Sequence, residues 1–120
     1  ATMAYGTLNC NVVEAVKLPS KDMLSKNDPY CTLELKGSTQ KHKTKSIKSA
    51  GAACRWEEQF SFNIIEGNSQ LLIQVWDKDS WSSDDVIGSA LLDLSSLFQT
   101  NAPVDRWVPL KDKKGREAGE

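Results

Sequence analysis

The sequence predicts an all-β fold, and three observations favour this class. Apolar and polar residues alternate in several short runs, and residues typical of turns, namely Gly, Asn, Ser and Pro, separate those runs. Only one short segment has the composition of a helical turn. Many short strands at regular intervals are typical of an antiparallel β-sandwich. We therefore expect the 120 residues to form one sandwich domain.

Seven strands account for the alternating runs. In the first, Leu8, Cys10 and Val12 alternate with polar Asn9 and Asn11, as in a strand with one buried face. The same period of two recurs along the chain. After this first strand, further strands are expected over residues 31–35, 43–47, 60–64, 71–75, 86–94 and 106–110. The helical turn is expected over residues 95–98.

Composition limits the class of protein. Hydrophobic residues make up 39% of the chain and charged residues 26%, and no apolar run approaches the roughly 18 residues that a membrane span needs. No secretory signal is visible at the N-terminus. Cys10, Cys31 and Cys54 are odd in number and lack metal-ligand spacing, which favours buried, reduced thiols. These features together predict a cytoplasmic globular protein.

The formal net charge of −1 conceals a division of charge along the chain. Residues 36–48 carry lysines and one histidine with no acid, while aspartates are concentrated in two other segments. The lysines of this basic run are Lys36, Lys41, Lys43, Lys45 and Lys48. The folded molecule is therefore expected to be an electrostatic dipole.

The aspartates lie in two segments that each follow a predicted strand. They are Asp22 and Asp28 in the first segment, and Asp77, Asp79 and Asp85 in the second. If the segments meet, the carboxylates repel one another, so a cation is needed among them. Hard oxygen ligands in irregular loops suit calcium, which takes about 6 to 8 oxygens at variable geometry. Zinc prefers His and Cys, and the one histidine, His42, lies far from both segments.

Motifs along the chain are similar to those of a known family. Asn-Asp-Pro-Tyr at residues 27–30 is similar to its (S/N)DPY signature, and Trp-Glu-Glu-x-Phe-x-Phe at residues 56–62 resembles its WNExFxF strand. Leu-x-Ile-x-Val-x-Asp-x-Asp at residues 71–79 looks like its third calcium loop, and Trp107-x-x-Leu110 matches its late strand. On these motifs, residues 6–110 resemble the C2 domain, a calcium-dependent phospholipid-binding Greek-key β-sandwich.

This resemblance implies a ligand set. Each of the five aspartates occupies a family ligand position, and together they would hold two or three Ca²⁺ ions. Asp28, Asp77 and Asp79 are expected to be shared between ions, with Asp22 and Asp85 at the sides. Asp84 is expected to be a neighbour of the site rather than a ligand.

The resemblance also implies an eighth strand, which would begin after Glu120. Residues 6–120 then form a single C2-like domain with seven visible strands. Either the chain continues beyond this point or another chain completes the sheet edge. Because an edge without a partner exposes unpaired amides, self-association through this edge is expected.

The implied function is calcium-dependent attachment to anionic phospholipid membranes, as a peripheral protein that moves from the cytoplasm when calcium rises. Met23, Leu24 and Trp81 lie beside the aspartates and are expected to insert into the membrane, because apolar side chains there are out of place in water. For Trp81 the competing expectation is that the ring folds back onto the rim of the sandwich.

Lys43 and Lys45 are the candidate contacts to lipid headgroups. They match half of the lysine cluster with which some C2 domains hold phosphoinositides, but Thr32 and Glu34 stand where the other half would be. A generic basic face is therefore favoured over specific phosphoinositide recognition. Nucleic acid binding is not expected, because the net charge is near neutral and the run lacks aromatic residues.

Rival functions fit the sequence less well. An EF-hand starting at Asp77 fails, because Ser82 stands where Gly is needed and Gly88 where Glu belongs. An enzyme is not expected, since the nucleophile, phosphate-loop and zinc-protease motifs are absent from the sequence. The alternative that remains is a protein-interaction module with structural calcium and no lipid binding.

Overall fold

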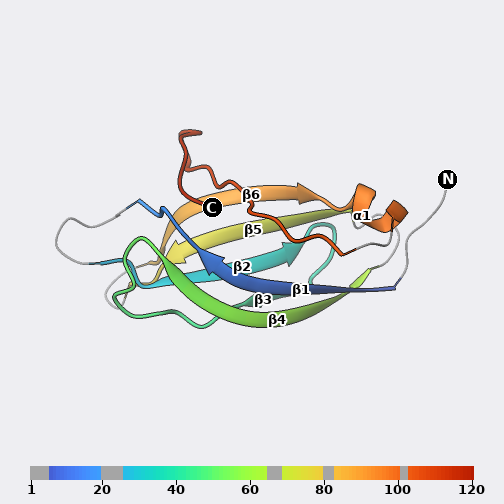
Figure 1. Ribbon diagram of the computed structural model, residues 1–120, viewed down its shortest axis with the longest axis horizontal. Helices are drawn as coiled ribbons and strands as arrows, with labels where there is room; N and C mark the ends of the chain where they lie inside the picture. The colour runs from blue at the N-terminus through green and yellow to red at the C-terminus, as the bar shows by residue number, and fades with distance from the viewer. Residues whose placement is uncertain (1–5, 20–25, 65–68, 80–82, 101–102) are drawn as a thin grey trace.

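The chain forms two facing antiparallel sheets (Figure 1). The computed structural model describes residues 6–19, 26–64, 69–79, 83–100 and 103–120. One sheet pairs β1 (Gly6–Ala15) with β4 (Cys54–Ile64). The other has the order β3 (Lys41–Lys43), β2 (Pro29–Leu35), β5 (Gln70–Asp77) and β6 (Asp85–Asp93). The antiparallel all-β sandwich predicted from the sequence is confirmed, with six strands rather than seven within the described residues.

The core lies between the sheets and follows the predicted alternation. Phe62 of β4, Leu35 of β2 and Ile87 of β6 are fully buried, and Leu8 and Cys10 of β1 pack against this cluster. Side chains at alternate positions of a strand point to opposite faces of its sheet, so one face of each strand supplies the core. The expected helical turn is present as α1 (Ser95–Thr100), which begins where Asp93 Oδ1 accepts the N–H of Ser95 at 2.9 Å.

The prediction of a strand over residues 106–110 is wrong. Within the described residues, this segment is not part of a strand, and Lys111, just after it, joins β6 by an isolated bridge to Ser89. Pro103 and Pro109 have no N–H to donate, which weakens any ladder along this segment. Gly88 lets the segment approach closely, because a Cβ atom there would stand 2.8 Å from that of Leu110.

The strand expected over residues 43–47 lies earlier, as β3. Its ladder with β2 ends where Lys43 faces Thr32. Beyond that point, the Thr44 N–H donates to Cys31 O at 2.9 Å and the Ile47 N–H to Pro29 O at 3.1 Å. Thr44 Oγ1 also accepts the Cys31 N–H at 2.9 Å, so a side chain substitutes for a ladder bond. Residues 44–47 therefore follow β2 without forming a regular strand.

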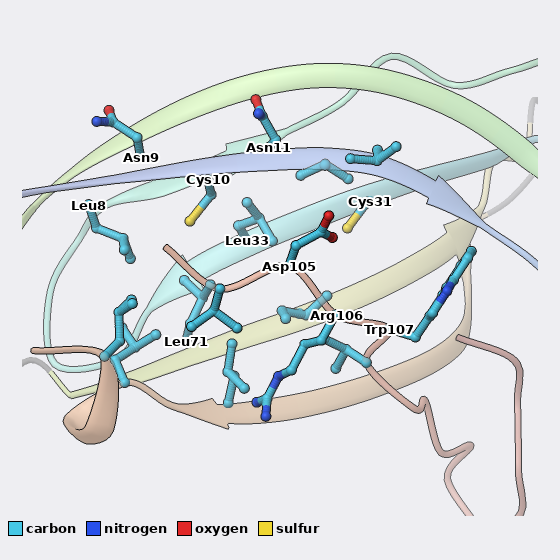
Figure 2. A pocket seen from close by; sticks show the side chains of 18 of the residues that line it. Leu8, Asn9, Cys10, Asn11, Cys31, Leu33, Leu71, Asp105, Arg106 and Trp107 are labelled. Atoms are coloured by element: carbon cyan, nitrogen blue, oxygen red, sulfur yellow. The ribbon is translucent and has the colours of Figure 1, made fainter. Parts of the chain in front are cut away.

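An apolar groove with a volume of about 1380 Å³ runs between β1 and residues 103–108. Figure 2 shows Leu8 and Cys10 directed into it from β1, while Asn9 and Asn11 point away. Within the described part of the chain, β1 has a ladder partner on one side only, namely β4. At one end of the groove, Val16 and Glu120 exchange backbone hydrogen bonds of 2.9 and 3.1 Å. The groove therefore leaves Leu8 and Cys10 partly exposed along an open sheet edge.

The cysteines are unpaired thiols, as expected. Burial raises the pKa of Cys31 to about 12 and the pKa of both Cys10 and Cys54 to about 11. Because the thiolate is the reactive form, all three thiols are protonated and unreactive at neutral pH. Among the described residues, no helix has the length and apolar character to cross a bilayer.

Replacing the buried Thr44 by valine should destabilise the fold. The change keeps the shape of the side chain but leaves the buried Cys31 N–H without its acceptor, which costs about 1–3 kcal/mol. Urea unfolding measures the difference in free energy. The exposed Thr7→Val on β1 is the matched control and should change stability by no more than about 0.5 kcal/mol. Equal stability of Thr44→Val and the native chain would contradict this role.

Self-association through the open edge of β1 stays a prediction, and its measurement is light scattering over a range of protein concentrations. We expect the mean mass to rise with concentration, because unpaired strand amides and exposed apolar side chains favour association. A strict monomer at every concentration would contradict it.

Candidate functional site

Strand register brings three of the predicted ligands to one end of the larger sheet. Pro29 of β2 pairs with Asp77 of β5, and Asp77 pairs with Asp85 of β6. Asp28 immediately precedes Pro29, so the carboxylates of Asp28, Asp77 and Asp85 come from three adjacent strand ends. These ends lie at the left of Figure 1.

A β-bulge in β6 sets the last two pairs of this ladder. Up to Val75, which pairs with Gly88, the β5–β6 register is regular. It then shifts by one residue, so that Trp76 pairs with Val86 and Asp77 with Asp85. Ile87, which is fully buried, is the extra residue on the bulged strand. The bulge therefore decides which residue of β6 lies opposite Asp77.

Backbone hydrogen bonds join the two aspartate segments. The Asp28 N–H donates to Asp77 Oδ1 at 2.9 Å, and the Lys78 N–H donates to Asp28 O at 3.1 Å. Asp28 Oδ1 also accepts the N–H of Ser49 at 2.7 Å. A carboxylate has two oxygens and about four acceptor sites, so these bonds leave capacity for a further ligand. One oxygen each of the Asp28 and Asp77 carboxylates is thus bonded to the scaffold.

The aspartates perturb one another electrostatically. The pKa of Asp77 is raised above its ordinary value, first by desolvation and then by the negative charges of Asp28, Asp85 and Asp79. The hydrogen bond from the Asp28 N–H partly opposes this rise. Like charges that raise a neighbour's pKa are the situation that a bound cation relieves. The donor set, composed of carboxylates, also suits calcium better than zinc.

Two residues near the site have structural roles that the sequence did not reveal. Asn27 is buried, and its Nδ2 donates to Pro19 O at 2.9 Å and to Gly51 O at 3.2 Å. It therefore anchors the residues just before Asp28 to a neighbouring turn. Asp84 Oδ1 accepts the N–H of Asp79 at 2.8 Å, a backbone contact that the sequence did not reveal, while the expectation that Asp84 is not a ligand stays a prediction. The position of Asn27 in the Asn-Asp-Pro-Tyr motif was the available signal for its role.

The ligand set as a whole stays a prediction. Asp22, Met23, Leu24 and Trp81 lie outside the described residues. Within the described ranges, no three His, Cys, Asp or Glu side chains stand together in a group that could hold a metal ion. Metal binding would thus require the carboxylates to turn toward a common point, or further ligands from outside those ranges.

The basic run forms an exposed edge of the larger sheet. Lys41, Lys43 and Lys45 are exposed, and on β2 Glu34 faces Lys41 while Thr32 faces Lys43. Glu34 lies 3.7 Å from Lys36 in an ion pair. These acidic and neutral partners confirm that the second half of a lysine cluster is not supplied by β2.

His42 lies on the opposite side of β3 from these lysines. Its ring packs against Phe60 and Phe62 at centroid distances of 5.2 and 4.9 Å, and Nε2 lies 3.0 Å from Ser61 O. His42 therefore links β3 to β4 as a packing residue.

Comparison with known proteins supports the same fold. The chain is 32% identical to the 16 kDa phloem protein 2 of Arabidopsis thaliana, over 93% of this chain and 76% of that protein. It is 32% identical to Synaptotagmin-5 of Arabidopsis thaliana, over 91% of this chain but only 19% of that protein. A solved C2 domain-containing protein from an elicitor-responsive gene superposes with a TM-score of 0.80 at 28% identity, covering 99% of this chain and 85% of that one.

The match to a family model extends over nearly all of the described sandwich. Residues 6–110 match the model of the C2 domain, a stretch that contains every strand and all of the predicted aspartate ligands. The motifs at residues 27–30, 56–62 and 71–79 fall within it. The chain therefore belongs to the C2 domain family.

Proposed function

We propose that this C2 domain attaches to anionic phospholipid membranes when calcium binds its aspartate-rich end. The observation that carries the proposal is the register that places Asp77 between Asp28 and Asp85, where their charges oppose one another. Relatives in the family bind phospholipid membranes and are typically non-catalytic modules. Residues 6–120 would act as one such module, without catalytic activity, in the cytoplasm and reversibly on its membranes.

The chain's own residues supply the switch. Asp28, Asp77 and Asp79 would be ligands shared between two or three ions, and Asp22 and Asp85 would complete the set. Without a cation, this end of the sandwich is negative and repels anionic headgroups. Bound calcium supplies positive charge and open coordination positions for phosphate or carboxylate oxygens of the lipid. Because hydrogen bonds already hold Asp28 to Asp77, little rearrangement of the sheet is needed.

Two groups of side chains would add contacts to the membrane. Met23, Leu24 and Trp81 would insert between headgroups, where burying one such side chain contributes about 1.5–3 kcal/mol. Lys43 and Lys45 would contribute about 1 kcal/mol each by attraction to the anionic surface. Glu34 beside Lys41 opposes a tightly bound phosphate, so we propose a preference for anionic surfaces in general over a specific phosphoinositide.

The second candidate is a protein-interaction module in which calcium has only a structural role. The open apolar groove beside β1 favours it, because an exposed strand edge can pair with a segment of another protein. Co-sedimentation with anionic vesicles, in calcium and in chelator, separates the two functions. The interaction module would not sediment with vesicles in either condition.

Calcium should raise the melting temperature. A ligand that binds only the folded state stabilises it by about 2.7 kcal/mol at one hundred times its dissociation constant. Thermal melts with calcium, magnesium or chelator measure the effect. Asp77→Asn keeps the acceptor for the Asp28 N–H but removes one charge, so its calcium-free melt should match or exceed that of the native chain while the calcium increment is lost. A native melting curve indifferent to calcium would rule out the site.

Trp81→Ala should weaken binding to anionic vesicles about tenfold or more at saturating calcium, because the insertion of an aromatic side chain is lost. Titration of the protein with vesicles measures the affinity. Binding is followed by a fluorescent label on the protein, because tryptophan emission would change with the substitution. Trp107→Ala is the matched control, since Trp107 is 49% exposed but lies along the groove. If both variants bind as tightly as the native chain, Trp81 does not enter the membrane.

A further inference from the structure

We propose that Tyr30 and Asp84 form a brace that positions Asp79 for calcium, so that Asp84 acts through Asp79 and not as a ligand. The inference rests on the proposed function, because it assigns residues to the same site. Its structural part, the restraint on the Asp79 backbone, stands without calcium.

The geometry of the brace uses both oxygens of one carboxylate. Asp84 Oδ2 accepts the phenol O–H of Tyr30 at 2.6 Å. Asp84 Oδ1 accepts the backbone N–H of Asp79 at 2.8 Å. Tyr30 belongs to β2, two residues after Asp28, whereas Asp84 immediately precedes β6. One side chain thus connects the strand that follows the first aspartate segment to the backbone of the second.

Tyr30 is itself fixed by the sheet. It pairs with Trp76 across the β2–β5 ladder, and the two rings are parallel within 4° at a centroid distance of 6.2 Å. Trp76 Nε1 in turn donates to Thr32 Oγ1 at 2.9 Å. The phenol is therefore carried by a packed pair of aromatic rings on the two central strands of the larger sheet, next to their ends at Pro29 and Asp77. Asp79 is positioned, through Asp84, relative to this rigid element.

The pKa values of Asp84 and Asp77 are shifted in opposite directions. The pKa of Asp84 is lowered, first by the hydrogen bond from the Asp79 N–H and then by the bond from Tyr30. The pKa of Tyr30 is raised to about 12, by burial and then by Asp84. An ionised carboxylate that accepts from a protonated phenol accounts for both directions. The charge of Asp84 is thus stabilised by hydrogen-bond donors, whereas the charge of Asp77 is opposed by neighbouring carboxylates.

Losing the brace should weaken calcium binding without removing a ligand. The Asp79 backbone would become freer, and binding would then have to order it. Because the brace is made of hydrogen bonds to a charged carboxylate, breaking it should lower calcium affinity about tenfold. Removing Tyr30 or Asp84 breaks the same unit, and their effects should therefore not add.

The test combines calorimetric titration of the full chain with calcium chloride and amide hydrogen exchange without calcium. Tyr30→Phe, which keeps every charge, should bind calcium about tenfold more weakly, and the double variant Tyr30→Phe with Asp84→Ala no more weakly than Asp84→Ala alone. Asp84→Asn keeps an acceptor for the Asp79 N–H and should lose less affinity than Asp84→Ala. In calcium-free protein, the Asp79 amide should exchange about tenfold faster in Asp84→Ala.

Three results would overturn the proposal. Unchanged exchange of the Asp79 amide in Asp84→Ala would show that no brace exists. Native calcium affinity in a folded Tyr30→Phe would show that the brace does not serve the site. Equal losses in Asp84→Asn and Asp84→Ala would identify Asp84 as a ligand. If the native chain binds no calcium, the proposed function fails, while the exchange measurement still decides whether the brace exists.

Discussion

The register of the β2–β5–β6 ladder is the constraint on which the candidate site depends. The pair of Pro29 with Asp77 brings together segments about fifty positions apart in the chain, and the pair of Asp77 with Asp85 adds the carboxylate of β6. The resulting repulsion among carboxylates is opposed by backbone hydrogen bonds, since Asp28 donates to Asp77 and accepts from Ser49. A flexible loop could separate its charges, but strand ends fixed by a sheet cannot. The scaffold thus keeps the strand ends that carry these carboxylates side by side.

Three surfaces of the sandwich therefore differ in charge and polarity. The strand ends around Asp77 are acidic and tied together by hydrogen bonds, whereas β3 presents exposed lysines. The groove beside β1 is apolar and open. Under the proposals made above, each surface would take a different kind of partner: a cation, an anionic surface, and an extended polypeptide. Calcium bound at the acidic end would change the charge of that end and leave the lysines of β3 and the apolar groove unchanged.

The alternation of apolar and polar residues predicted features that depend on neighbouring residues in the sequence, such as strands and their buried faces. Alternation in β1 and β5 was enough to identify strands and their buried faces, whereas the meeting of the two aspartate segments was implied by the resemblance to C2 domains. The regular strand expected over residues 106–110 failed because ladder formation depends on partners and on N–H groups that Pro109 lacks. The bond between Tyr30 and Asp84 spans 54 positions and depends on a side-chain direction, which spacing does not encode. The burial of Asn27 was missed for the same reason.

The bulge at Ile87 has a consequence for how such a site can be lost or gained. In a regular continuation of the ladder, Val86 would lie opposite Asp77 and the carboxylate of Asp85 would be displaced along the edge. The bulge thus absorbs one residue of β6, and a strand of the same length without the bulge would displace Asp85 while every aspartate remained in the sequence. Among homologous chains, the pairing of this strand is therefore as informative about metal binding as the presence of the aspartates, and a count of ligand residues alone would misassign the function of a copy that had lost the bulge at the same strand length.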